Sequence, residues 1–282
     1  MNRRKWIGFE WLLAAFIAIN FANLAWQTLA YGYLPQPFFY ESGDLWMDWF
    51  NTAWWAHNGG AYDTWGTLYP PLSFVLLKIM GLSHCYADSP GLETRACDGL
   101  GVAFIHLFYA LNIVLAGIAL SRIDRSTALP RAFALTAGMP MLSGLERANL
   151  VLICFTCMLF AFASLQHRAW VRWLALGMAI NLKVYVIAAL AGILLHHKWR
   201  RFEGAILATL VVYLCTFMLV GSGSPSQLAG NIIEWSGGFQ SASILDLWYP
   251  NTYKPLMSLL EGTGFPIVTV VGSAVADNGL VA

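Results

Sequence analysis

Two carboxylates, Asp44 and Asp48, stand four residues apart in the stretch Ser42-Gly-Asp-Leu-Trp-Met-Asp-Trp49. A positioned carboxylate can remove the proton from a hydroxyl nucleophile as attack develops, and carboxylate oxygens are also the ligands that hard divalent cations prefer. On a helix, residues at i and i+4 share one face, so both side chains would point the same way. This pair could therefore act in catalysis or bind a metal ion. A third interpretation is structural: Asp48 would only make an exposed helix face more polar.

The chain as a whole is strongly apolar. Of its 282 residues, 58% are hydrophobic and 11% are charged, and the mean hydropathy is +0.59. This composition is too apolar for an ordinary soluble domain and predicts an integral membrane protein. The net charge of +1 gives no basic field of the kind that attracts nucleic acid. The first apolar run, residues 6–29, is longer than the core of a signal peptide, so we expect it to stay and span the membrane.

Basic residues fall into four clusters, and the positive-inside rule assigns all four to the cytoplasm. The clusters are Arg3, Arg4 and Lys5; Arg122, Arg125 and Arg131; His167, Arg168 and Arg172; and His196, His197, Lys198, Arg200 and Arg201. Each apolar stretch between clusters must then leave and return, which predicts an all-α polytopic helix bundle with a cytoplasmic N-terminus. Its expected parts are an outward helix at residues 6–29, an external loop at 31–99, an inward helix at 100–120, a hairpin between 131 and 166, and an outward helix at 205–220.

The stretch 173–195 is long enough for one crossing, yet both of its flanks are basic. We expect two short helices that are broken near Asn181-Leu-Lys183, with Lys183 facing the outer side or a water-filled cavity. The alternative is one continuous span in which the long side chain of Lys183 reaches toward the interface.

On this topology Asp44, Asp48, Glu146, Arg147 and Lys183 gather on the external face. Charged groups at membrane depth are costly unless they are paired or wetted, so their gathering on one side is a functional-site hypothesis. The alternative is a set of solvated loop charges that form no common site.

The external loop is rich in tryptophan, which favours the membrane interface. We therefore expect an amphipathic helix over residues 44–58 that lies on the outer surface. After Pro70 and Pro71, which suit the first turn of a helix, residues 73–82 are too few to span comfortably and predict a second surface helix. Cys85 and Cys97 flank a polar segment on the external side, where a disulfide is permitted, and we expect them to form one.

Three segments of the loop resemble, in order and spacing, the first external loop of the GT-C glycosyltransferases. They are Ser-Gly-Asp44-Leu, Gly59-Gly-Ala-Tyr62 and Tyr69-Pro-Pro-Leu72. The closest likeness is the GT87-like branch, which depends on polyprenol-phosphate-mannose. Further along, Leu145-Glu-Arg-Ala-Asn-Leu150 is similar to the Glu-Arg-Gly-Asn segment of that branch, and Asn181-Leu-Lys-Val-Tyr185 resembles its Lys-x-Tyr-Pro segment.

The chain departs from that branch in several places. Ala148 stands where glycine is usual, and Val186 stands where proline is usual. Members are usually longer, and residues 266–282 give no convincing final span. We therefore expect a single transmembrane domain, 1–282, whose C-terminal part is incomplete relative to the family.

The resemblance implies a membrane enzyme of the bacterial cell envelope, in the plasma (inner) membrane. It would move a hexose such as mannose from a polyprenyl-phosphate donor to a hydroxyl of a glycolipid or glycan acceptor, on the external face and with inversion. Asp44 would be the general base. The branch is regarded as metal-independent, so no cofactor is expected. The substrate-binding candidates in the matching segments are Tyr69, Glu146, Arg147, Asn149, Lys183 and Tyr185. Asp48 stands where the family commonly has an aromatic residue, and it is a further substrate-binding candidate on its own chemistry, as a second carboxylate that could help to hold the acceptor.

Two other classes of function remain open from the sequence. A polytopic transporter or flippase-like protein would line its substrate path with intramembrane charges, although such proteins often show internal repeats and none is seen here. A non-catalytic membrane subunit would keep the fold without the chemistry.

Overall fold

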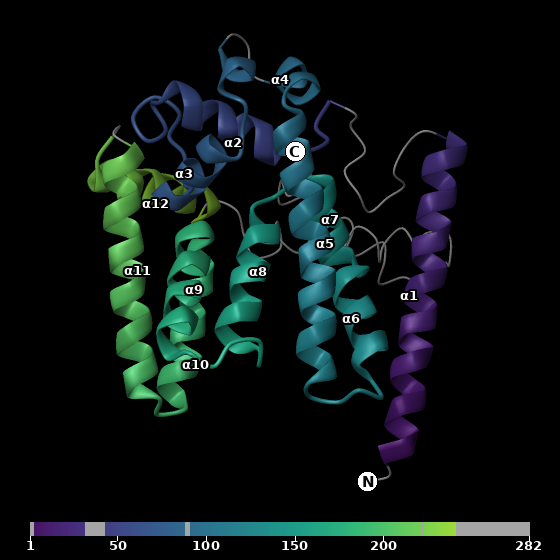
Figure 1. Ribbon diagram of the computed structural model, residues 1–282. Helices are drawn as coiled ribbons and strands as arrows, with labels where there is room; N and C mark the ends of the chain where they lie inside the picture. The colour runs from purple at the N-terminus through teal and green to yellow at the C-terminus, as the bar shows by residue number, and fades with distance from the viewer. Residues whose placement is uncertain (1–2, 32–42, 88–90, 221–222, 241–282) are drawn as a thin grey trace, which may run out of the picture. The chain divides into compact units, whose positions relative to one another are not determined.

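The computed structural model describes residues 3–31, 43–87, 91–220 and 223–240. These residues form helices and contain no strands, which confirms the all-α prediction (Figure 1). The chain divides into two compact units, Met1–Gly223 and Ser224–Ala282. Within the second unit, the described residues form α12 (Pro225–Gln240).

Three helices of the described residues are long and apolar enough to cross a membrane. They are α1 (Arg3–Tyr31), α5 (Gly99–Ser121) and α11 (Trp199–Val220). Large apolar side chains are exposed along them, such as Leu29 at 85% and Met218 at 82%. In water this surface would drive aggregation, whereas lipid tails solvate it, so the chain is an integral membrane protein.

The predicted hairpin between residues 131 and 166 is present, but its first arm is broken into two helices. These are α6 (Ala128–Thr136) and α7 (Met139–Glu146), and α8 (Val151–Phe162) forms the second arm. Pro140 lies in the first turn of α7, where its missing N–H costs nothing, and it could not continue α6 without breaking the hydrogen-bond ladder.

The stretch after α8 is broken at Lys183, as the basic flanks predicted. It consists of α9 (Ala169–Leu182), the 3₁₀ helix η2 (Val184–Ile187) and α10 (Ala188–Leu195), and the backbone of Lys183 is extended between them. Leu176 and Ile180 of α9 share one buried cluster with Leu190 and Ile193 of α10. The two helices therefore form a hairpin that is shorter than a full crossing in each arm.

Helix α9 lies directly against α11. A Cβ atom on Gly177 would come within 2.8 Å of the backbone carbon of Ala208, so this position has room for no side chain. One turn further on, the Asn181 side chain donates to the carbonyl oxygen of Thr209 at 3.0 Å. Small residues that let two backbones touch, with a polar side chain across the contact, are typical of helix packing in membranes.

Arginines fasten one end of α8. The guanidinium of Arg172 donates to the carbonyl of Ala161 at 3.0 Å, and that of Arg201 donates to the same oxygen at 2.7 Å. Arg122 donates to the carbonyl of Ser164. The last carbonyls of a helix have no partner within the helix, so these cations satisfy them and complement the helix dipole.

The short helices of the predicted external loop gather at the other end of the bundle. Figure 1 shows α2 (Met47–Asn58), α3 (Pro71–Ile79) and α4 (Leu92–Cys97) opposite the connections that join α5 to α6, α8 to α9 and α10 to α11. The 3₁₀ helix η1 (Ser83–Tyr86) lies between α3 and α4 in the sequence. The basic clusters and the predicted site residues thus fall at opposite ends.

The predicted helix over residues 44–58 begins three residues late, at Met47. Trp46 has φ 64, in the left-handed region that a right-handed helix excludes, and it forms the boundary. The prediction that Asp44 and Asp48 share one face of a helix is therefore wrong. Asp48 lies in the first turn of α2, and Asp44 lies in the turn before it.

A buried polar bridge joins α5 to α8. The Asn112 amide donates to the carbonyl of Leu152 at 2.8 Å, and its oxygen accepts from the hydroxyl of Thr156 at 2.6 Å. Asn112 is 0% exposed. Hydrogen bonds of this kind hold membrane helices together without help from the hydrophobic effect.

We expect Asn112→Ala to destabilise the protein by about 1 kcal/mol, because it removes both bonds of this bridge. The unfolding midpoint in detergent should fall by about 2–4 °C. Val114→Ala is the matched control, since Val114 lies on the same helix but is 56% exposed. Equal midpoints for the two variants would contradict a role for the bridge.

Candidate active site

The turn that carries Asp44, residues 43–46, belongs to no helix and is held by contacts to distant segments. We call it the Asp44 turn. The backbone N–H of Trp46 donates to the carbonyl oxygen of Glu146 at 2.9 Å, which attaches the turn to the end of α7. Arg95 donates from its guanidinium to the carbonyl of Leu45 at 2.8 Å. The position of Asp44 is thus set by tertiary contacts.

Arg147 joins the two carboxylates of the opening motif. One guanidinium nitrogen pairs with Asp44, and the other donates to Asp48 at 2.9 Å. The three side chains are partly accessible, with exposed fractions of 26% for Arg147, 38% for Asp44 and 22% for Asp48. The planar guanidinium can contact two anions at once, which a lysine cannot do with the same geometry. Asp44 and Arg147 therefore lie within one site, although about a hundred residues separate them in the chain.

Asn149, which lies just before α8, is the second residue that bonds to Asp48. Its amide nitrogen donates to Asp48 at 2.6 Å, and its oxygen accepts from the backbone N–H of Val151 at 3.0 Å. Between Arg147 and Asn149, Ala148 has φ 49, in the left-handed region where glycine is at ease. The resembled branch has glycine at this position, so the turn keeps the conformation that glycine favours although the residue has changed.

Lys183 and Tyr69 form a second part of the site. The Lys183 ammonium lies 4.6 Å from the centre of the Tyr69 ring, a distance typical of a cation–π contact. Burial raises the pKa of Asp48, and the charge of Lys183 partly opposes that rise. Tyr185 is 66% exposed on η2, two residues beyond Lys183.

Burial dominates the electrostatics of the carboxyl groups. It raises the pKa of Asp48 above its ordinary value, against the hydrogen bond from Asn149 and the charge of Lys183. Burial, together with the negative charge of Asp48, also raises the pKa of Glu146. Burial and the same charge raise the pKa of Tyr69 to about 12, so its phenol stays protonated at neutral pH.

Glu146 is buried, at 5% exposure. Among the described residues, no donor reaches its Oε2 atom. A buried carboxylate oxygen without a donor is costly, and a ligand hydroxyl would satisfy it.

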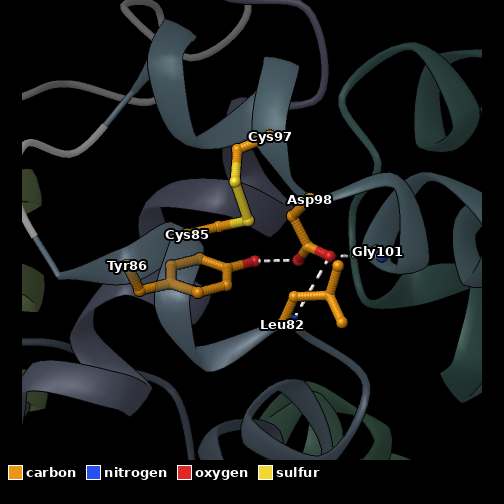
Figure 2. Close-up of a disulfide and its surroundings, with 6 residues drawn as sticks. All are labelled: Leu82, Cys85, Tyr86, Cys97, Asp98 and Gly101. Atoms are coloured by element: carbon orange, nitrogen blue, oxygen red, sulfur yellow. Dashed lines mark hydrogen bonds between the residues drawn. A yellow bond between two sulfur atoms is a disulfide. The ribbon is translucent and has the colours of Figure 1, made fainter.

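Two places could be considered for a metal ion. The guanidinium of Arg147 lies between Asp44 and Asp48, where a cation bound by both carboxylates would have to sit. The ligand atoms of His84, Cys85 and Cys97 lie within 4.8 Å of one another. Figure 2 shows, however, that the two cysteines are joined in a disulfide, which removes the thiolates that would bind a metal.

Arg95, which binds the carbonyl of Leu45 beside Asp44, is the residue of the site that the sequence did not reveal. It lies in the polar segment between the two disulfide cysteines, fifty residues from the carbonyl that it binds. No periodicity or motif connects it to Asp44. Its basic charge on the external side, where basic residues are less frequent, is a signal that could have drawn notice.

An apolar cavity of about 360 Å³ lies among α3, α5, α8 and α9. Ile153, which lines it, is one turn beyond Asn149 on the chain. The volume lies in the range of small-molecule binding sites. Its lining residues are Leu76, Met80, Phe108, Ile153, Thr156, Cys157, Phe160, Val171, Leu174, Ala175 and Met178.

The model of glycosyltransferase family 87 matches residues 67–257, well over half of the chain. Together with the helical membrane fold, this match defines the protein as a membrane glycosyltransferase. It belongs to glycosyltransferase family 87. The matched range contains Tyr69, Glu146, Arg147 and Lys183, and it begins after Asp44 and Asp48. No curated protein and no solved structure matches the chain.

Proposed function

We propose that the protein transfers a hexose such as mannose from a polyprenyl-phosphate donor to a hydroxyl of a glycan or glycolipid acceptor. The transfer inverts the anomeric centre, uses no metal and takes place on the external face. The observation that carries this proposal is the bridge that Arg147 makes between Asp44 and Asp48. It puts a candidate base beside a cation suited to phosphate, as a transfer from a sugar phosphate requires.

In the proposed reaction Asp44 takes the proton of the acceptor hydroxyl while its oxygen attacks the anomeric carbon. The bond from that carbon to the phosphate oxygen breaks on the opposite face, and its electron pair leaves with the polyprenyl phosphate. Arg147 and Lys183 stabilise the charge on the departing phosphate. Because Arg147 is paired with Asp44 in this structure, the donor phosphate competes for the guanidinium and releases the carboxylate to act as base.

The remaining predicted residues hold the substrates in this proposal. The unsatisfied Oε2 atom of Glu146 suits a sugar hydroxyl. Asp48 and Asn149, which bond to each other, present further groups for sugar hydroxyls. Tyr69 keeps its phenolic proton and can donate a hydrogen bond to the phosphate, and Tyr185 borders the same space.

The apolar cavity supports a lipid-linked donor. Its lining comes from helices that end at the proposed site, and a prenyl chain bound there would lie on the bilayer side of Asn149 and Lys183. A lipid chain gains no shelter from water by leaving the bilayer, so such a cavity serves to orient the donor.

The basic clusters support the orientation. All four lie at the end of the bundle remote from α2, α3 and α4, so the positive-inside rule assigns the site to the external face and the N-terminus to the cytoplasm (Figure 1). With a polyprenyl-phosphate donor, this fits the plasma membrane of a bacterium.

The test is transfer of radiolabelled hexose by the purified protein in nanodiscs. Polyprenyl-phosphate-mannose and polyprenyl-phosphate-glucose are offered with a mixture of mannoside and lipid-linked acceptors. Labelled product that requires the polyprenyl phosphate, with the anomeric configuration inverted by NMR, is the expected result. Transfer from a nucleotide sugar alone, or no transfer from either donor, would exclude the proposed donor.

As the pH is lowered, the enzyme should lose activity at a higher pH than it would if Asp48 had the pKa of an ordinary aspartate. Burial raises the pKa of Asp48 above 3.8, so this carboxylate takes up its proton earlier as the pH falls and then loses its ion pair with Arg147. The acidic limb of the kcat/KM profile should therefore lie above pH 3.8. In Asp48→Asn that limb should move to lower pH, because one titration and one negative charge near Asp44 are removed. An acidic limb that stays in place would exclude Asp48 from this role.

A further inference from the structure

We propose that Arg95 is a positioning residue for Asp44, and that the Cys85–Cys97 disulfide holds Arg95 in place. The proposal rests on the function proposed for Asp44. It assigns to the disulfide-closed segment of the external loop a part in setting the geometry of the base.

The Asp44 turn has one local hydrogen bond, from the N–H of Met47 to the carbonyl of Asp44 at 3.1 Å. Trp46, a bulky residue, has φ 64, a conformation that costs free energy and persists only where the surroundings impose it. Two hydrogen bonds from distant segments support it at the backbone: from Arg95 to the carbonyl of Leu45, and from Trp46 to the carbonyl of Glu146. They grip consecutive residues, directly after Asp44, from two separate parts of the fold.

Arg95 therefore acts on the peptide unit next to the carboxylate. Its donor nitrogen is 2.8 Å from the Leu45 oxygen, and a charged donor makes a hydrogen bond about twice as strong as a neutral one. If that bond is lost, the left-handed conformation of Trp46 is still supported from the side of α7 but no longer from α4. The carboxylate of Asp44 would then sample a wider range of positions.

Helix α4 cannot hold Arg95 unaided. It has only six residues, and isolated helices of that length are not stable in water. Its stability must come from contacts with the rest of the fold, such as the burial of Thr94 at 1% exposure and the attachment of its C-terminal end.

The C-terminal end of α4 is fastened by the disulfide and by Asp98 (Figure 2). Cys97, the last residue of α4, is bonded to Cys85 of η1. The adjacent Asp98 is 0% exposed; its carboxylate accepts from the hydroxyl of Tyr86, from the N–H of Leu82 at 3.3 Å and from the N–H of Gly101 at 2.9 Å. This carboxylate ties η1 to the first turn of α5.

The segment is also joined to the helix that carries Asp48. The Asn58 amide at the end of α2 donates to the carbonyl of Tyr86 at 2.8 Å, and the His57 ring stacks on that of Tyr86 with centres 4.4 Å apart. The far end of α2 and the turn before its start are thus both held by the same disulfide-closed segment. Asp44 and Asp48 are positioned together relative to Arg147.

A general base that is displaced from the acceptor hydroxyl lowers the rate of the reaction. A shift of about 1 Å in a catalytic group can cost up to about 100-fold in rate. We expect Arg95→Met, which keeps the length of the side chain but has no donor, to lower kcat about 10-fold while the KM for the donor stays within about twofold of wild type. Arg95→Lys retains a donor and should recover most of that loss.

Amide hydrogen exchange tests the positioning without any assay of activity. In Arg95→Met, the Trp46 amide should exchange about 10-fold faster, measured by mass spectrometry on peptides that span residues 43–50. Glu93→Gln is the matched control, because Glu93 lies on the same helix and is exposed. Unchanged exchange and unchanged kcat in Arg95→Met would overturn the proposal.

The disulfide is tested by the variant Cys85→Ser/Cys97→Ser. It should show the same faster exchange of Trp46 and a similar fall in kcat. Combined with Arg95→Met it should cost no more than the larger of the two effects, because both act through one contact. Additive losses would mean that the disulfide does not act through Arg95.

If the wild-type protein transfers no sugar, the proposed function fails, and the exchange experiment still decides whether Arg95 holds the Asp44 turn.

Discussion

Asp44→Asn is expected to lower kcat for sugar transfer by about 10²- to 10⁴-fold, the range that a general base contributes. The amide keeps the size of the side chain and can still accept a hydrogen bond, but it cannot take the proton of the acceptor hydroxyl. Because the loss concerns a step of the reaction, the KM for the donor should change little. Transfer of radiolabelled hexose by wild-type and variant protein in nanodiscs measures both quantities.

Asp63→Asn is the control for this result. Asp63 lies in the same external loop and is exposed, and its carboxylate accepts a local hydrogen bond from the N–H of Thr64 at 2.9 Å. Its replacement should leave kcat unchanged. If Asp44→Asn retained wild-type activity, another group would have to be the base, and the assignment of Asp44 would be wrong.

Arg147→Met is expected to lower kcat/KM by about 10²- to 10³-fold, as does the loss of one preorganised donor in other active sites. The variant removes the cation that stabilises the departing phosphate in the proposed reaction. It also leaves Asp44 and Asp48 without the guanidinium that bridges them, so the two carboxylates repel each other. The same transfer assay checks this, with donor concentration varied to separate kcat from KM.

Arg147→Lys separates charge from geometry. It keeps a positive charge but loses the fork that contacts both carboxylates, so we expect an intermediate loss of about 10-fold. Arg125→Met is the control, since Arg125 is exposed and lies in the second basic cluster, remote from the site. A loss in Arg147→Lys as large as in Arg147→Met would show that geometry, and not charge, carries the effect.

The broken helix at Lys183 and the gathering of Asp48 and Arg147 on one face could be anticipated from the sequence. Basic residues on both flanks of residues 173–195 favoured a chain that turns back rather than one continuous span, and Lys183 was the polar residue near the middle. Charges are rare in this chain, so their positions constrain the fold strongly. The same scarcity made Asp48 and Arg147 candidates for one site before any contact was known.

The local geometry around Asp44 could not be anticipated. Helical periodicity extended the surface helix back to Asp44, because nothing in the stretch Asp44-Leu-Trp marks a helix boundary. The left-handed conformation of Trp46 is imposed by Arg95 and by the carbonyl of Glu146, which are distant in sequence. Local propensity carries no information about such contacts. The disulfide was expected only because the topology placed both cysteines on the oxidising side.

The tight packing of α9 against α11 restricts how a lipid could approach Lys183. At Gly177 the two backbones touch, and the bond from Asn181 to Thr209 closes the next turn. At this contact the two helices leave no room for the prenyl chain of the proposed donor. A lateral entry route from the bilayer would therefore pass on the other flank of α9, between α9 and α8 beneath α3, where the 360 Å³ cavity lies.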